Sequence, residues 1–181
     1  MRSSFLSLVS AFILASCAAS LPYASDYPLT DRRVVFHDGS ISGWIPQGWL
    51  VPQDDSLDTV LQAWLVTEDF SATMGVRELI LDRLSSARVQ SEGMQLLASL
   101  TIAMRGDSTL KGIDVHEFEL KGRRCAGYEI TDMEGKRQRI VVFSAQEKFY
   151  ECSILTAHRA TTGQLSHLFR AQQTFLSTLK F

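Results

Sequence analysis

Residues 125–157 read CAGYEITDMEGKRQRIVVFSAQEKFYECSILTA, and this stretch determines much of the expected architecture. Three segments in it are rich in apolar and β-branched residues: 125–131, 139–143 and 149–157. The polar stretch 132–136 separates the first two and carries Gly135 where a hairpin loop needs a positive φ. A second polar break, 146–148, precedes the third segment. The pattern predicts antiparallel strands joined by hairpins.

Further strands and helices are expected on both sides of this stretch. Strands are predicted at 34–36, 60–66, 72–78 and 113–120. Apolar residues at intervals of three or four predict two helices between residues 79 and 104, broken near Gly93. A terminal helix is predicted over 161–179, with Thr162 as its cap. Strands, helices, more strands and a helix indicate an α+β fold, an antiparallel β-sheet covered by helices.

The first residues form a targeting segment. Arg2 precedes the mostly apolar run 5–14, which is shorter than the roughly 20 residues that span a bilayer. The tetrapeptide Leu14-Ala15-Ser16-Cys17 resembles the lipobox of bacterial lipoprotein precursors. That resemblance implies cleavage after Ser16 and acylation of Cys17. The alternatives are an ordinary secretory signal with a chance cysteine and a short buried helix.

The chain is therefore expected to have three parts. Residues 1–16 are the lipoprotein signal peptide, 17–32 the lipidated N-terminus with a flexible tether, and 33–181 a single domain. In lipoproteins of enteric-type bacteria, an aspartate after the lipidated cysteine favours the inner membrane. Ala18 stands at that position, so we expect a lipid-anchored envelope protein on the periplasmic face of the outer membrane.

The net charge of the chain narrows the classes of partner that we expect. The chain has 18 Lys and Arg against 20 Asp and Glu, whereas nucleic-acid-binding domains are usually strongly basic, so we expect no nucleic-acid partner.

In an oxidising compartment Cys125 and Cys152 could form a disulfide. In a simple meander, however, they lie two strands apart, roughly 9 to 10 Å, beyond the ~7 Å that a disulfide allows. We favour two semi-buried free thiols; a different strand order would favour the disulfide.

The order of these elements resembles a known family. The passages that carry the resemblance are 45–49 (IPQGW), 71–79 (SATMGVREL), Gly127-Tyr128 at a strand start and 175–181 (FLSTLKF). They are similar to PsbP-like domains, which are grouped with the Ran-binding Mog proteins and the bacterial DcrB-type lipoproteins. The resemblance covers most of 33–181 and implies an α/β/α sandwich with an accessory, scaffold or binding role. It supplies no shared catalytic residues.

The sequence carries no catalytic or metal-binding signature. H-E-x-x-H, C-x-x-C and G-x-S-x-G are all absent. The histidines, His37, His116, His158 and His167, are not spaced to share one metal. We therefore predict a non-enzyme without a cofactor or metal. Because a triad can assemble from distant residues, an envelope hydrolase stays a third hypothesis.

Two groups of side chains are candidates for binding a partner. Trp44 and Trp49 surround Pro46 and Gly48, where their rings either line a groove or interface, or plug the end of the sheet against a helix. The second group is a basic cluster around the Cys125 hairpin. It contains Arg123, Arg124 and Arg137, with Lys121, Lys136 and Arg139. It either meets anionic headgroups or an acidic partner, or is a solvated sheet edge.

These observations lead to two main hypotheses. The first is a non-catalytic, lipid-anchored accessory or assembly module that binds another envelope protein through Trp44, Trp49, Arg123, Arg124 and Arg137. The second is a periplasmic lipoprotein that binds a small ligand or a metal in a pocket between sheet and helix.

Overall fold

The computed structural model describes residues 25–52, 61–105 and 113–181. The predicted signal peptide 1–16, Cys17 and the tether up to residue 24 lie outside the described residues. In the part of the chain that is described, no helix combines the length and the apolar character needed to cross a membrane.

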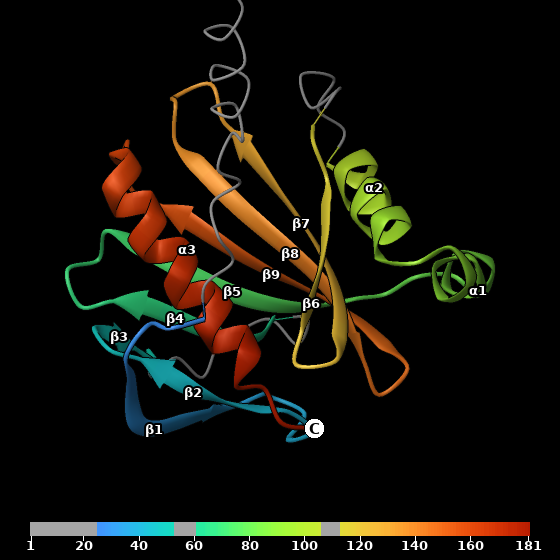
Figure 1. The fold of residues 1–181 in the computed structure, drawn as a ribbon, viewed down its shortest axis with the longest axis horizontal. Helices are drawn as coiled ribbons and strands as arrows, with labels where there is room; N and C mark the ends of the chain where they lie inside the picture. Colours follow the sequence, from blue (N-terminus) through green and yellow to red (C-terminus); the bar gives the residue numbers. More distant parts are fainter. Residues whose placement is uncertain (1–24, 53–60, 106–112) are drawn as a thin grey trace, which may run out of the picture.

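A large antiparallel sheet forms the centre of the domain (Figure 1). The strands are β1 (Leu29–Val35), β2 (Ser42–Pro46), β3 (Trp49–Leu50), β4 (Leu61–Thr67), β5 (Ala72–Leu79), β6 (His116–Leu120), β7 (Arg123–Thr131), β8 (Arg137–Ala145) and β9 (Lys148–Thr156). Among the described residues, seven strands make the sheet in the order β3-β4-β5-β9-β8-β7-β6. β1 and β2 pair separately.

The predicted meander is confirmed. β6 pairs with β7, β7 with β8 and β8 with β9, all antiparallel. Gly135 in the β7–β8 turn has φ 77°, as the sequence predicted, and Gln146 and Glu147 also have positive φ in the β8–β9 turn. The meander joins the N-terminal strands through β5 and β9, which pair from Ala72 opposite Thr156 to Leu79 opposite Phe149.

The helices are α1 (Arg83–Glu92), α2 (Met94–Met104) and α3 (Thr162–Ser177). Gly93, with φ 100°, separates α1 from α2 where the sequence predicted a break. The predicted cap of α3 is wrong by one residue, since Thr161 and not Thr162 caps it. The Thr161 hydroxyl accepts from the Gln164 N–H, and the Gln164 side chain accepts from the Thr161 N–H. This capping box satisfies two amides that would otherwise have no partner.

Helices lie on both faces of the sheet, which confirms the α/β/α arrangement (Figure 1). α3 and the β1–β2 pair cover one face, and alternate residues of β9, Tyr150, Cys152 and Ile154, join that core. α1 and α2 supply the core on the other face, where Phe149 of β9 packs. The period of two along β9 thus divides its side chains between the two layers.

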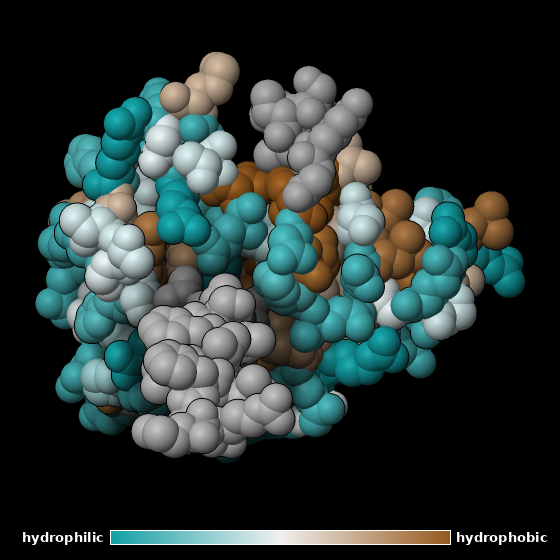
Figure 2. All heavy atoms as spheres, turned by 45° about the horizontal axis from the view of Figure 1, so that its top comes forward, coloured by the Kyte–Doolittle hydropathy of each residue, from teal (hydrophilic) through white to brown (hydrophobic). Residues whose placement is uncertain are grey.

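Two large apolar side chains are exposed at the start of α1. Ile80, just before α1, and Leu84 within it are both 78% exposed. Figure 2 shows hydrophobic surface toward the side of α1 and α2, whereas the side of α3 is largely hydrophilic.

A glycine lets α3 approach the β1–β2 pair closely. A Cβ atom added at Gly43 would lie 2.8 Å from the Phe175 ring and 2.9 Å from Leu179. The chain end is bound to the same strand, because Ser42 and Lys180 exchange two backbone hydrogen bonds. Gly43 is therefore required by close packing and not by its backbone angles.

Two expectations about the N-terminus and the thiols can be compared with the structure. Cys125 on β7 and Cys152 on β9 are free and buried, with β8 between them, so the free-thiol interpretation is confirmed. β1 begins at Leu29, which pairs with Pro46. Residues 29–32, expected to belong to the tether, are therefore part of the fold.

Candidate functional site

A groove lies between the β4–β5 turn and the first half of α3. Its volume is about 420 Å³, within the roughly 300–1,000 Å³ that small-molecule sites usually have. The segments that line it are far apart in the sequence and meet only because β5 pairs with β9. The lining residues are Tyr27, Gly48, Trp49, Thr67, Glu68, Asp69, Ser71, Thr156, His158, Arg159, Ala160, Gln164, His167 and Leu168.

The β4–β5 turn forms an acidic wall. Oδ1 of Asp69 accepts hydrogen bonds from the Ser71 N–H (3.0 Å) and hydroxyl (2.7 Å). These bonds lower the pKa of Asp69 to about 2, so its carboxylate is ionised at neutral pH. Phe70, between them, has φ 57° and is 71% exposed. Glu68 precedes it, so the turn presents two carboxylates and an exposed aromatic ring.

The opposite wall comes from the β9–α3 connection and α3 itself. His158 and Arg159 lie before the helix, and His167 lies within it. Nε of Arg159 donates a 2.6 Å hydrogen bond to the Glu134 carbonyl in the β7–β8 turn. The guanidinium packs over Gly135, where an added Cβ would lie 2.7 Å from Nε. Arg159 is thus held toward that turn.

The N-terminal arm closes one side of the groove. The Tyr27 N–H donates to the Thr174 hydroxyl at 3.0 Å, and the Tyr27 hydroxyl lies 2.9 Å from Nε2 of His167. Burial raises the pKa of Tyr27, and the charge of Arg170 opposes this only in part. Arg170 also forms an ion pair with Asp26 at 2.8 Å. The arm that leads to the predicted anchor is therefore bound along α3.

The two tryptophans predicted to act together are in different places. Trp49 is 3% exposed, packs in the core and forms part of the groove floor with Leu168. Trp44 is not among the lining residues. The centre of its ring lies 4.0 Å from the Arg33 guanidinium, and its backbone N–H donates to the Thr178 hydroxyl. Trp49 thus lines a groove, whereas Trp44 lies half-buried on β2 outside it.

The predicted basic cluster does not assemble. Arg123 and Arg124 begin β7, whereas Arg137 pairs with Thr131 at its far end. β7 has nine residues, and the eight steps between them at about 3.3 Å each place its ends roughly 26 Å apart. The prediction is wrong because a hairpin brings the ends of two strands together but separates the two ends of one strand.

The arginines of this group have structural contacts instead. Arg123 donates to the carbonyls of Leu176 and Leu179 at the end of α3, and burial lowers its pKa. Arg137 forms an ion pair with Glu129 across the β7–β8 hairpin. Arg124 lies against Gly93, where an added Cβ would be 2.5 Å from its guanidinium.

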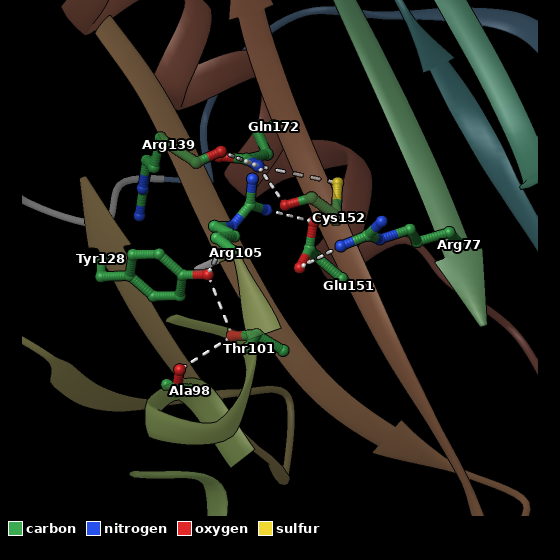
Figure 3. Close-up of polar contacts among 9 residues, drawn as sticks. All are labelled: Arg77, Ala98, Thr101, Arg105, Tyr128, Arg139, Glu151, Cys152 and Gln172. Carbon is green, nitrogen blue, oxygen red and sulfur yellow. Dashed lines mark hydrogen bonds and ion pairs between the residues drawn. The ribbon is translucent and has the colours of Figure 1, made fainter. Parts of the chain in front are cut away.

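A buried carboxylate on the α2 face of the sheet was not foreseen (Figure 3). Glu151 is 2% exposed and accepts from Arg77 of β5 at 3.1 Å and from Arg105, which ends α2, at 2.7 Å. Nε of Arg105 also lies 3.4 Å from the Tyr128 hydroxyl, which is 2.9 Å from Thr101. Burial alone would lower the pKa of Arg105, but these contacts outweigh it and the pKa is raised. The cluster fastens α2 to β9.

The described residues offer no evident catalytic or metal centre. Within ranges 25–52, 61–105 and 113–181, no three His, Cys, Asp or Glu side chains are placed to hold a metal ion. Burial raises the pKa of the Cys125 thiol to about 11 and that of Cys152 to about 12, so neither is a ready nucleophile.

Sequence reasoning missed the acidic wall, and a local signal existed. The stretch Glu68-Asp69-Phe70-Ser71 places an aromatic residue inside a polar turn, where the Asp and Ser side chains favour the turn itself. No local pattern in the sequence indicates that Tyr27 is part of a site, because its contacts with α3 are to residues more than a hundred positions away.

Comparisons with known proteins give the fold. No family model matches the chain, and no curated protein matches its sequence. The solution structure of cyanobacterial PsbP (CyanoP) from Synechocystis sp. PCC 6803 is similar, with TM-score 0.56 and 10% identity over 82% of this chain and 91% of that one. The chain has the PsbP-like fold. The Ran-binding protein Mog1p of Saccharomyces cerevisiae is also similar, with TM-score 0.55 and 11% identity over 84% of this chain and 95% of Mog1p.

Proposed function

We propose that this chain is a non-catalytic, lipid-anchored protein of the bacterial envelope that binds another envelope protein through the groove beside α3. The observation that carries the proposal is the groove itself, which has the buried Trp49 in its lining and is bordered by the β4–β5 turn. Phe70 is exposed in that turn, between the lining residues Asp69 and Ser71. The residues that dominate binding energy between proteins are enriched in aromatic side chains and cluster in well-packed pockets of the interface. Binding is also the role named for Mog1p, which has a similar fold.

The proposed anchor is the lipidated Cys17, supported by the Leu14-Ala15-Ser16-Cys17 lipobox. Ala18 favours the periplasmic face of the outer membrane. The arm joins the domain at Asp26 and Tyr27, beside the groove. A partner in the groove would therefore be held close to the membrane that bears the anchor.

The test is a cross-linked pull-down of the full-length protein from its native membranes, read by mass spectrometry. Phe70→Ser removes the exposed ring beside the groove, and Leu84→Ser is the matched control, because Leu84 is equally apolar and 78% exposed on α1. We expect Phe70→Ser to lose the partner and Leu84→Ser to retain it. Cys17→Ala should reduce recovery if anchoring brings the two proteins together. Equal recovery with Phe70→Ser and wild type would overturn the proposed surface.

The volume of the groove supports a second candidate function, the binding of a small periplasmic ligand. At about 420 Å³ it could enclose a metabolite-sized molecule. A ligand of this kind would raise the melting temperature in proportion to the logarithm of its concentration above Kd. A thermal-shift screen of metabolites on wild type and on Thr156→Phe, which would fill the groove, distinguishes this function from protein binding.

A further inference from the structure

The charge of the groove is unbalanced. Its lining contains the carboxylates of Glu68 and Asp69 and one guanidinium, that of Arg159, together with the imidazoles of His158 and His167. Neither carboxylate forms an ion pair within the described residues. The hydrogen bonds that hold Asp69 come from neutral groups of Ser71, so they fix its orientation without cancelling its charge.

The single guanidinium of the lining does not turn toward this acidic wall. Arg159 donates to the Glu134 carbonyl and packs against Gly135 in the β7–β8 turn. Its position leaves the negative potential of the β4–β5 turn largely uncompensated on the groove side. A cationic group bound at the β4–β5 turn would therefore lie beside two carboxylates that form no ion pair within the described residues.

The apolar side chains of the groove add a second requirement for anything that binds there. Trp49 and Leu168 are buried apolar side chains that line the groove, and Phe70 is exposed in the β4–β5 turn, between the lining residues Asp69 and Ser71. An aromatic face attracts both an alkyl stem and the cation at its end. The surface is thus complementary to a side chain with an apolar stem and a positive head, next to an apolar neighbour.

We infer that the groove recognises a segment of a partner protein in which a lysine or arginine lies next to an apolar residue. This inference rests on the proposed function and specifies its partner. The positive head pairs with Glu68 and Asp69, its stem lies along Phe70, and the apolar neighbour contacts the Trp49–Leu168 floor. Electrostatic attraction selects the segment, and the apolar contact retains it.

The probe is a blocked, fluorescently labelled hexapeptide in which lysine and leucine alternate, and its counterpart has glutamate in place of lysine. Binding to the purified full-length protein is measured by anisotropy, and the site is located by NMR shifts of the Gly48 and Ser71 amides. We expect the lysine peptide to bind with these shifts and to weaken several-fold from 50 to 500 mM salt, because exposed ion pairs are screened. We expect the glutamate peptide to bind at least about fivefold more weakly.

Charge-reversal variants make the test specific. Glu68 has no side-chain hydrogen bond or ion pair within the described residues, so Glu68→Lys should fold normally and weaken the lysine peptide about fivefold or more. Glu147→Lys makes the same change in the β8–β9 turn, at the opposite end of the sheet, and should leave affinity within about twofold. If both variants weaken binding of the lysine peptide equally, the loss reflects the net charge of the protein and not the groove, and the inference is overturned.

Failure of this inference is distinguishable from failure of the proposed function. If both peptides bind at the groove with equal affinity, the preference for a basic segment is wrong while the groove remains a binding site. If neither peptide shifts the groove amides, the inference is also wrong, and the proposed function is judged separately by the Phe70→Ser pull-down.

Discussion

Substitution of Glu151 by glutamine should be among the most destabilising single changes that preserve side-chain size. Glu151 is 2% exposed and bound by Arg77 and Arg105, whose side chains are 46% and 25% exposed. Removing one partner of a buried ion pair costs about 3–5 kcal/mol, because the remaining charge is left desolvated. Since Arg77 can return to solvent and Arg105 cannot fully do so, we expect about 3 kcal/mol.

Urea denaturation of the purified protein measures this loss. With an m-value of about 2 kcal/mol/M, a loss of about 3 kcal/mol lowers the midpoint by about 1.5 M. The matched control is Glu92→Gln, which breaks the Arg88–Glu92 pair on the surface of α1, where the side chains are 61% and 49% exposed. That pair should be worth about 0.3–0.5 kcal/mol, or about 0.2 M.

The urea midpoints of the two variants, compared with each other, test whether burial makes the Glu151 carboxylate important for stability. A Glu151→Gln midpoint no lower than that of Glu92→Gln, at an unchanged m-value, would refute the reasoning that burial makes this carboxylate important. The double variant Glu151→Gln/Arg105→Gln adds a check, because removing both charges should cost less than the sum of the single losses.

Three further predictions concern single residues. Thr161→Ala should lower the free energy of unfolding by about 1 kcal/mol through loss of the α3 capping box, whereas Thr162→Ala should change it much less; thermal melts followed by circular dichroism compare them. The lowered pKa of Asp69 means that its hydrogen bonds stabilise the fold fully above the ordinary carboxyl range, near pH 4, and lose this effect as pH falls through about 2. An NMR titration should give a midpoint near 2, Ser71→Ala should raise it, and a wild-type midpoint near 4 would contradict the geometry. Gly43→Ala should destabilise by about 1–3 kcal/mol through overpacking, and a melting temperature equal to wild type would show that Phe175 moves aside freely.

The meander could be predicted from sequence because its information is local. Within 125–157, apolar and β-branched residues indicate each strand, and a short polar turn such as that around Gly135 indicates each hairpin. Once those hairpins are assigned, β8 must lie between Cys125 and Cys152, so the free thiols follow. The start of the domain was placed too late because Leu29 becomes a strand only by pairing with β2.

The candidate site could be predicted only in fragments. The sequence indicated that Trp49 could line a groove. The groove itself forms because the β4–β5 turn, α3 and Tyr27 meet in the fold, and the spacing of residues in the sequence does not predict that meeting. The basic residues looked like one patch because they are neighbours along the chain. Strand direction separates Arg123 from Arg137, and hydrogen bonds to α3 occupy the former.

The pairing of β5 with β9 has a consequence for the order in which the chain can complete its fold. Gly75 lies opposite Ser153, 153 − 75 = 78 residues later. During synthesis at about 5–20 residues per second, β5 would wait roughly 4–16 s before its partner is made. Until then its edge is unpaired and the central sheet is incomplete. A nascent chain of this topology therefore cannot complete its central sheet until almost all of it has been synthesised.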